Sequence, residues 1–98
     1  LACQWYVNYG NGKWTKVTSS GFNKPVGDTS PTLTIKLMQD ASYKLKITSS
    51  DNNFGTAGVL TSNIISLSII DKGEFTIQAT YDLNSNELVF ISCFWQDI

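Results

Sequence analysis

The sequence predicts an all-β protein, an antiparallel immunoglobulin-like β-sandwich of about seven strands. Apolar and polar residues alternate in several short segments, which is the period of half-buried strands. Residues that favour turns separate these segments, and no segment has a helical period. The 98 residues contain no linker, repeat or low-complexity stretch. We therefore expect a single domain over residues 1–98.

The first two expected strands form a hairpin. Residues 3–8 alternate between apolar and polar side chains, and Asn11-Gly12 is a typical hairpin turn into residues 13–17. The alternation turns Trp5 toward the core and Trp14 toward the more polar face of its strand. The other inward side chains of the hairpin are Cys3, Val7 and Val17.

The remaining strands follow a long polar loop that ends at Pro31. Each is a run of alternating residues bounded by Gly, Asn, Asp or Ser, which favour turns. An eighth strand forms if Val59-Leu60 pairs with a neighbour. The expected ranges are 33–37, 43–48, 65–69, 74–81 and 88–95.

The composition argues against several classes of function. The chain has a net charge of -1, with seven lysines and no arginine, whereas nucleic-acid binding depends mainly on neutralising phosphates. Histidine is absent, which removes the commonest general base and metal ligand. No apolar run approaches the roughly 18 residues of a membrane span. We therefore expect no enzyme activity, no cofactor or metal, no nucleic-acid partner and no membrane span.

The two cysteines, Cys3 and Cys93, lie near the ends of the first and last expected strands. We expect them to form a disulfide, which stabilises by about 4–5 kcal/mol in the chain-entropy model and indicates an oxidising compartment. Two alternatives remain open. Leu1-Ala2-Cys3 resembles the end of a bacterial lipoprotein signal, with Cys3 as the lipidated residue, or both cysteines are free buried thiols. The disulfide and the lipid anchor both indicate a secreted or cell-surface protein.

Aromatic and amide residues outside the core are the candidates for a binding site. Trp14 offers a rigid apolar plane and an N–H donor, unless the loop at residues 19–31 covers it. Phe54 and Gly55 interrupt a polar loop, in which Phe54 either contacts a ligand or fills the edge of the sandwich. The other candidate ligand-binding residues are Tyr6, Tyr9, Asp51, Asn52 and Asn53.

The final strand offers a second candidate surface. If Cys93 faces inward, the alternation turns three apolar side chains outward, namely Leu88, Phe90 and Phe94. An apolar outer face either packs beneath a loop or contacts a partner protein.

Several segments in a fixed order resemble a known family. A Tyr-Lys-Leu-Lys strand leads into an Asn-Asn-Phe-Gly loop, and Lys-Gly-Glu-Phe-Thr-Ile and Tyr-Asp-Leu-Asn-Ser-Asn-Glu-Leu follow. Over about residues 40–90 this order resembles the small β-sandwich modules of bacterial pullulanases and outer-membrane starch-binding lipoproteins. The resemblance implies non-catalytic binding of an α-glucan such as starch, by aromatic stacking and amide hydrogen bonds. The alternative is a secreted, disulfide-stapled protein that acts by protein–protein contact, as an adhesin module, effector or inhibitor.

Overall fold

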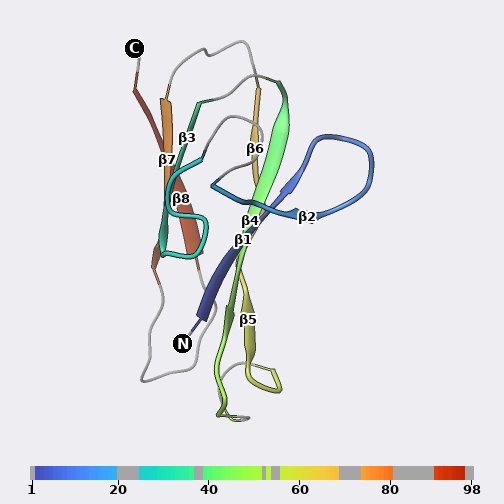
Figure 1. The fold of residues 1–98 in the computed structure, drawn as a ribbon, viewed down its shortest axis with the longest axis vertical. Coiled ribbons are helices and arrows are strands. Elements are labelled where there is room, and N and C mark those ends of the chain that lie inside the picture. The colour runs from blue at the N-terminus through green and yellow to red at the C-terminus, as the bar shows by residue number, and fades with distance from the viewer. Residues whose placement is uncertain are drawn as a thin grey trace.

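The structure is a computed structural model that describes residues 2–19, 25–36, 39–51, 53, 56–68, 74–80 and 90–96. Within these ranges the chain forms eight β-strands and no helix. The strands lie in two antiparallel sheets on either side of one hydrophobic core (Figure 1). The predicted all-β, antiparallel, two-sheet fold is confirmed. Accordingly, no helix in the described residues is long and apolar enough to cross a membrane.

The first sheet is built around one long strand pair. Its strands are β1 (Ala2–Asn8), β2 (Thr15–Lys16), β4 (Ala41–Thr48), β5 (Val59–Thr61) and β6 (Ile65–Leu67). They are arranged in the order β2-β1-β4-β5, and β6 also pairs with β4. The pairing of β1 with β4 runs from Ala2 opposite Thr48 to Asn8 opposite Ser42. Because this pairing covers the whole of β1, it fixes which residues of the two strands are neighbours.

β5 and β6 follow the same edge of β4 with a bulge between them. From Lys46 to Tyr43 β4 advances three positions, whereas its partner advances four, from Thr61 to Ile65. One extra residue in a partner strand is the definition of a β-bulge. The sequence predicted an eighth strand if Val59-Leu60 paired with a neighbour. Val59 pairs with Thr48 and Leu60 with Ile47, so this strand is present.

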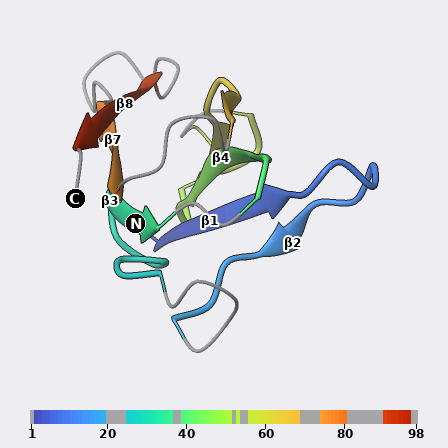
Figure 2. The ribbon, with the colours of Figure 1, turned by 90° about the horizontal axis from the view of Figure 1, so that it is seen from above.

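The second sheet consists of β3 (Thr32–Lys36), β7 (Glu74–Thr80) and β8 (Phe90–Gln96), in the order β3-β7-β8. β7 is the central strand and pairs with β3 from Thr32 opposite Gln78 to Lys36 opposite Glu74. Figure 2 shows this sheet beside the first one, seen nearly along its strands. β3 and β8 are therefore the two edges of the second sheet.

The core contains the side chains that alternation turned inward. Trp5 is 0% exposed, and its indole Nε1 donates a hydrogen bond to the carbonyl oxygen of Ser30 at 2.7 Å. The buried position of Trp5 is thus confirmed, and its polar N–H has the partner that a buried indole needs. The other buried residues on predicted inward faces are Val7, Val17, Leu33, Ile35, Tyr43, Leu45, Ile47, Phe75, Ile77 and Ile91.

A side-chain amide links the two sheets. Asn63, between β5 and β6, donates from Nδ2 to the carbonyl oxygen of Ile91 at 3.3 Å and accepts the Ile91 N–H on Oδ1 at 2.8 Å. Both groups of a strand residue point to the same side in an antiparallel ladder. Asn63 therefore pairs with backbone groups of β8 that face away from β7, and it covers part of an edge strand.

The connection from β1 to β2 differs from the prediction. The ladder ends at Val7 opposite Thr15, so the connection is a longer loop and not the predicted two-residue turn at Asn11-Gly12. The side chains of Asn8 and Asn11 each accept the backbone N–H two residues later, at 2.8 and 3.0 Å. Such bonds stabilise local turns, and two of them in succession account for the longer loop.

The structure does not support the predicted disulfide, because Cys3 and Cys93 are both free thiols in it. Cys3 belongs to β1 and Cys93 to β8, and both are half-buried against the core. The segment before β3 contacts β1 through the hydrogen bond from the Trp5 N–H to the Asp28 carbonyl oxygen, 3.0 Å.

The two cysteines belong to different sheets, where Cys3 lies opposite Ile47 and Cys93 opposite Ile77. Burial raises the pKa of both thiols, Cys3 and Cys93.

Candidate functional site

The outer face of the first sheet carries aromatic rings and lysines together. Alternation along β1 and β4 turns every second side chain away from the core, and β2 contributes one more outward residue. Trp14, immediately before β2, is half-buried and lies against this face through Lys44. We define the lysine–aromatic face by five residues: Tyr6, Trp14, Lys16, Lys44 and Lys46.

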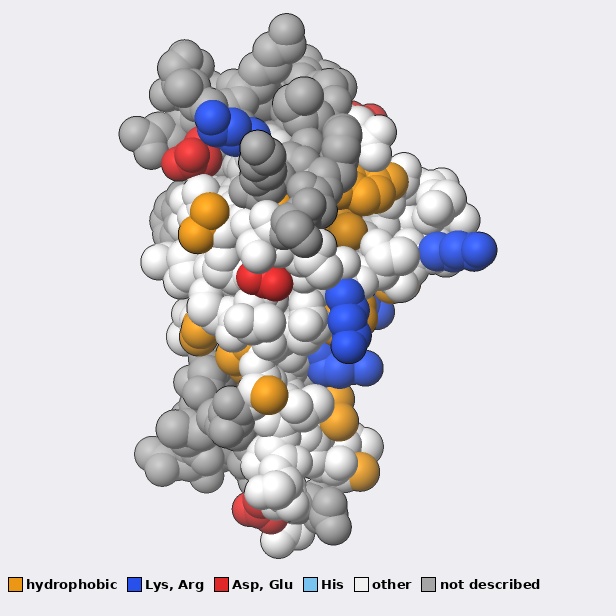
Figure 3. All heavy atoms as spheres, in the orientation of Figure 1, with side chains coloured by type: hydrophobic (Ala, Val, Ile, Leu, Met, Phe, Trp, Pro, Cys, Tyr) orange, Lys and Arg blue, Asp and Glu red, His pale blue; other side chains and the backbone are white. Residues whose placement is uncertain are grey.

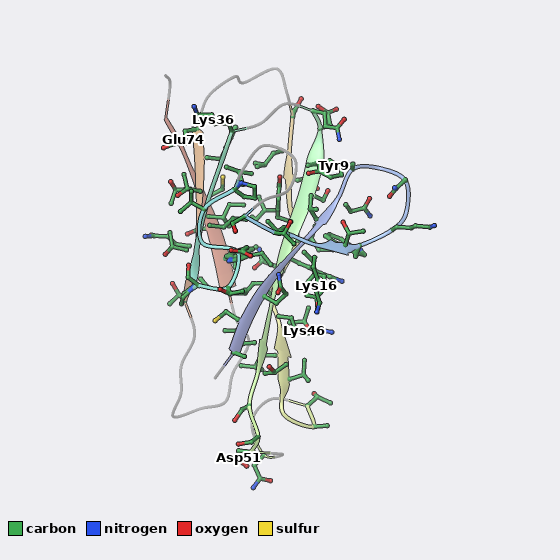
Figure 4. All side chains as sticks on the ribbon, viewed as in Figure 1. Tyr9, Lys16, Lys36, Lys46, Asp51 and Glu74 are labelled. Carbon is green, nitrogen blue, oxygen red and sulfur yellow. The ribbon has the colours of Figure 1, made fainter. Side chains whose placement is uncertain are left out.

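The strand register places Tyr6 at the centre of this face. Tyr6 lies opposite Lys16 of β2 on one side and opposite Lys44 of β4 on the other. Lys46, two residues along β4, lies opposite Gln4 on the same face. Figure 4 shows the labelled Lys16 and Lys46 projecting to the same side of the sheet, although they come from different strands.

Each ring of the face contacts a lysine ammonium. The Nζ of Lys44 is 4.4 Å from the centroid of the Trp14 ring, and the Nζ of Lys46 is 5.6 Å from the centroid of the Tyr6 ring. Both distances are within the range of cation–π attraction, which is worth about 0.5–1 kcal/mol at exposed sites. Both rings are half-buried. The contacts therefore orient the rings while part of each ring stays accessible.

A groove of about 700 Å³ adjoins the Tyr6 ring, whereas Trp14 and Lys44 are not among the residues that line it. Gln4, Tyr6, Lys16 and Lys46 line it from the first sheet, and Thr29 and Pro31 line it from the loop before β3. Gln4 is held in place because its Nε2 donates to the carbonyl oxygens of Trp5 at 3.0 Å and Val17 at 3.1 Å. The groove thus combines an aromatic ring with amide, hydroxyl and ammonium groups.

The charge of the groove is positive. Figure 3 shows lysine side chains gathered at mid-height, where Figure 4 labels Lys16 and Lys46. No carboxylate from the described residues lines the groove. The carboxylates that the structure describes are Asp28, Asp40, Asp51 and Glu74.

Tyr9, a predicted binding residue, contributes to the core and not to the lysine–aromatic face. It is partly buried against the core, and its hydroxyl shares a hydrogen bond with that of Tyr43. Burial raises the pKa of Tyr43, and both the charge of Tyr9 and the hydrogen bond to it raise that pKa further. The pKa of Tyr9 is also raised, because burial raises it more than the hydrogen bond to Tyr43 lowers it. This tyrosine pair is a structural contact.

Asp51 and Asn53, the described residues of the predicted loop, lie away from the lysine–aromatic face. Asp51 and Asn53 are exposed beyond the end of β4, where Asp51 Oδ1 accepts the Asn53 N–H at 2.9 Å. Figure 4 labels Asp51 at the far end of the molecule from Tyr9 and below Lys16 and Lys46. The structure does not bring these loop residues onto the lysine–aromatic face. Asn52 and Phe54 lie outside the described residues.

The second candidate surface also lies largely outside the described residues. Leu88 lies outside the described residues, and for Phe90 and Phe94 only the backbone is described. That backbone pairs Phe90 with Thr80 and Phe94 with Thr76. Ile91 is fully buried and Cys93 half-buried, as the predicted alternation of this strand requires.

Sequence reasoning selected two residues of the site, Trp14 and Tyr6, and missed the lysines. The alternation of residues 43–48 already placed Lys44 and Lys46 on an outward face, so a signal existed for them. The pairing of β4 with β1, which brings these lysines beside Tyr6, has no such signal in the sequence.

Comparisons with protein-family models, with curated proteins and with solved structures find no match for this chain. The described residues contain no group of three or more His, Cys, Asp or Glu side chains that could hold a metal ion. The site is therefore interpreted from its own geometry.

Proposed function

We propose that this protein is a non-catalytic carbohydrate-binding module whose binding site is the lysine–aromatic face with its adjoining groove. The observation that carries the proposal is the position of Tyr6 and Trp14. Both rings are held by lysines and partly accessible on the outer face of a regular sheet. The groove beside Tyr6 is lined by side chains that form hydrogen bonds.

The chemistry of a sugar matches such a surface. One face of a pyranose ring presents C–H groups, which pack on an aromatic plane, and the rim presents hydroxyls. Gln4, Lys16 and Lys46 offer hydrogen-bonding groups beside Tyr6. Because Gln4 is fixed by two backbone bonds, it loses little further freedom on binding. The secreted or cell-surface location expected from the sequence stays a prediction.

The α-glucan that the family resemblance implied is one member of the proposed ligand class. We expect dissociation constants on the order of micromolar to millimolar, because a shallow groove gains little free energy per ligand atom. Maltohexaose, xylohexaose and oligogalacturonides form a suitable panel. Binding is measured by calorimetry and by quenching of tryptophan fluorescence.

Two ring variants test where binding occurs. Trp14→Ala and Tyr6→Ala should each weaken binding at least about tenfold, the loss expected when a stacking ring worth about 1.4 kcal/mol is removed. Ile64→Ala is the control, because Ile64 is a 56% exposed apolar side chain outside the face. Failure of the whole panel to bind contradicts the proposal. Unchanged affinity in both ring variants contradicts the assigned site.

A further inference from the structure

We infer that the glycan bound by the lysine–aromatic face is an acidic one, whose carboxylates are recognised by Lys16, Lys44 and Lys46. This inference rests on the proposed function and narrows its ligand class. It concerns the charge of the bound glycan, because aromatic rings stack on neutral and acidic sugars alike.

The first step is the grouping of the three ammonium groups. Lys44 and Lys46 are two residues apart on one face of β4, about 7 Å between Cα atoms. Lys16 lies across β1 from Lys44, about 10 Å away at two strand spacings. Three of the seven lysines therefore share one small face of a chain with net charge -1. Such a distribution is strongly asymmetric.

The second step is the position of the carboxylates relative to these lysines. Across the strands, Lys16 and Lys44 lie opposite Tyr6, and Lys46 lies opposite Gln4 and Thr61. Lys16 and Lys46 line the groove with no described carboxylate, and Asp28, next to the lining residue Thr29, is not part of the lining. Like charges held at these distances repel, and the cation–π contacts with Trp14 and Tyr6 offset this only in part. A bound anion removes the repulsion.

The third step compares ligands. A neutral glucan in this groove covers ammonium groups and offers them only uncharged acceptor oxygens, which costs desolvation. A sugar carboxylate offers an anionic acceptor, so that both partners of the hydrogen bond are charged and attract each other as an ion pair. Nucleic acid is the less favoured polyanion, because the chain has no arginine and only these three lysines on the face. The groove and its charge together favour a uronic-acid polysaccharide.

The test compares ligands that share one sugar backbone and differ in charge. A hexamer of galacturonic acid and its fully methyl-esterified form have the same ring geometry, and the ester lacks the negative charges. The acid should bind the full chain at least about tenfold more tightly at low salt. Because exposed charges are screened, this preference should shrink as salt is raised to about 0.5 M. Maltohexaose and a single-stranded oligothymidylate complete the series.

Lysine variants show which side chains produce the preference for the acid over its ester. Lys16→Gln and Lys46→Gln should each weaken binding of the acid about two- to fivefold, the range for one partly exposed ion pair. Binding of the ester should weaken less than binding of the acid in both variants, because the ester loses a hydrogen-bond donor but no ion pair. Lys13→Gln in the exposed loop and Lys36→Gln on the second sheet are matched controls and should change neither.

The outcomes separate this inference from the proposed function. Equal affinity for the acid, its ester and maltohexaose overturns the inference and leaves the carbohydrate-binding function intact. No binding of any glycan overturns both. Tighter, salt-dependent binding of the oligothymidylate, lost in the same two lysine variants, also overturns both and identifies the face as a nucleic-acid site.

Discussion

Replacing Asn63 with alanine should loosen β8 from the first sheet. The Asn63 amide makes two hydrogen bonds with the backbone of Ile91, of 2.8 and 3.3 Å, across the boundary between the sheets. Ile91 is 0% exposed. The substitution therefore removes both partners from the backbone groups of a buried residue at a sheet edge.

The expected cost follows from those two bonds. A neutral hydrogen bond contributes about 0.5–1.5 kcal/mol net, and a buried group left without a partner costs about 1–3 kcal/mol. Because water reaches part of this edge, we expect a loss of about 2–4 kcal/mol in the free energy of unfolding. A domain of this size has about 5–15 kcal/mol in total. The variant should therefore still fold, with a much smaller free energy of unfolding.

Urea unfolding measures the loss. With a slope of about 1–3 kcal/mol per molar urea, the unfolding midpoint should fall by about 1–3 M. Amide hydrogen exchange gives a local measurement, because the N–H of Ile91 should exchange faster even where the domain stays folded. Asn63→Asp keeps one acceptor oxygen but sets a second oxygen against the Ile91 carbonyl. It should destabilise at least as much as Asn63→Ala.

Asn11→Ala is the matched control. Asn11 makes one hydrogen bond, from the Lys13 N–H at 3.0 Å, in an exposed loop. Its loss should lower the free energy of unfolding by about 0.5–1 kcal/mol. An Asn63→Ala midpoint within about 0.3 M of the parent, with unchanged exchange at Ile91, would refute the cross-sheet role of this amide.

Three further predictions address the core, the tyrosine pair and the thiols. Trp5→Ala should cost about 3–5 kcal/mol in urea unfolding because it leaves a cavity in the core, whereas Trp14→Ala should cost about 1 kcal/mol or less; equal losses would contradict the opposite orientations. Because the pKa of Tyr43 is raised in the folded state, the unfolded chain loses its tyrosine proton first. Stability should therefore be full below about pH 10 and fall as pH rises above it, and a Tyr43→Phe variant with the same alkaline loss would rule this out. Cys3 and Cys93 should both be labelled after unfolding without reductant, and slowly before it because burial raises their pKa; resistance of both to labelling would show that they are bonded.

The alternation along single strands was sufficient to predict the fold class and the core. Trp5, Tyr43 and Ile77 each occupy the inward face that the period-two pattern gave them. The reason is local and physical, because successive side chains of a strand point to opposite faces whatever the strand pairs with. The same rule placed Trp14 on the outward face before any partner strand was known.

Tertiary structure decided which outward residues became neighbours. Strand order and register depend on contacts between segments far apart in the chain, and alternation within one strand carries no information about them. For this reason the sequence did not reveal that Lys16 and Lys44 flank Tyr6. The same long-range order set Cys3 and Cys93 in different sheets. The sequence by itself therefore determined the face of each side chain, and the packing of the two sheets determined the site.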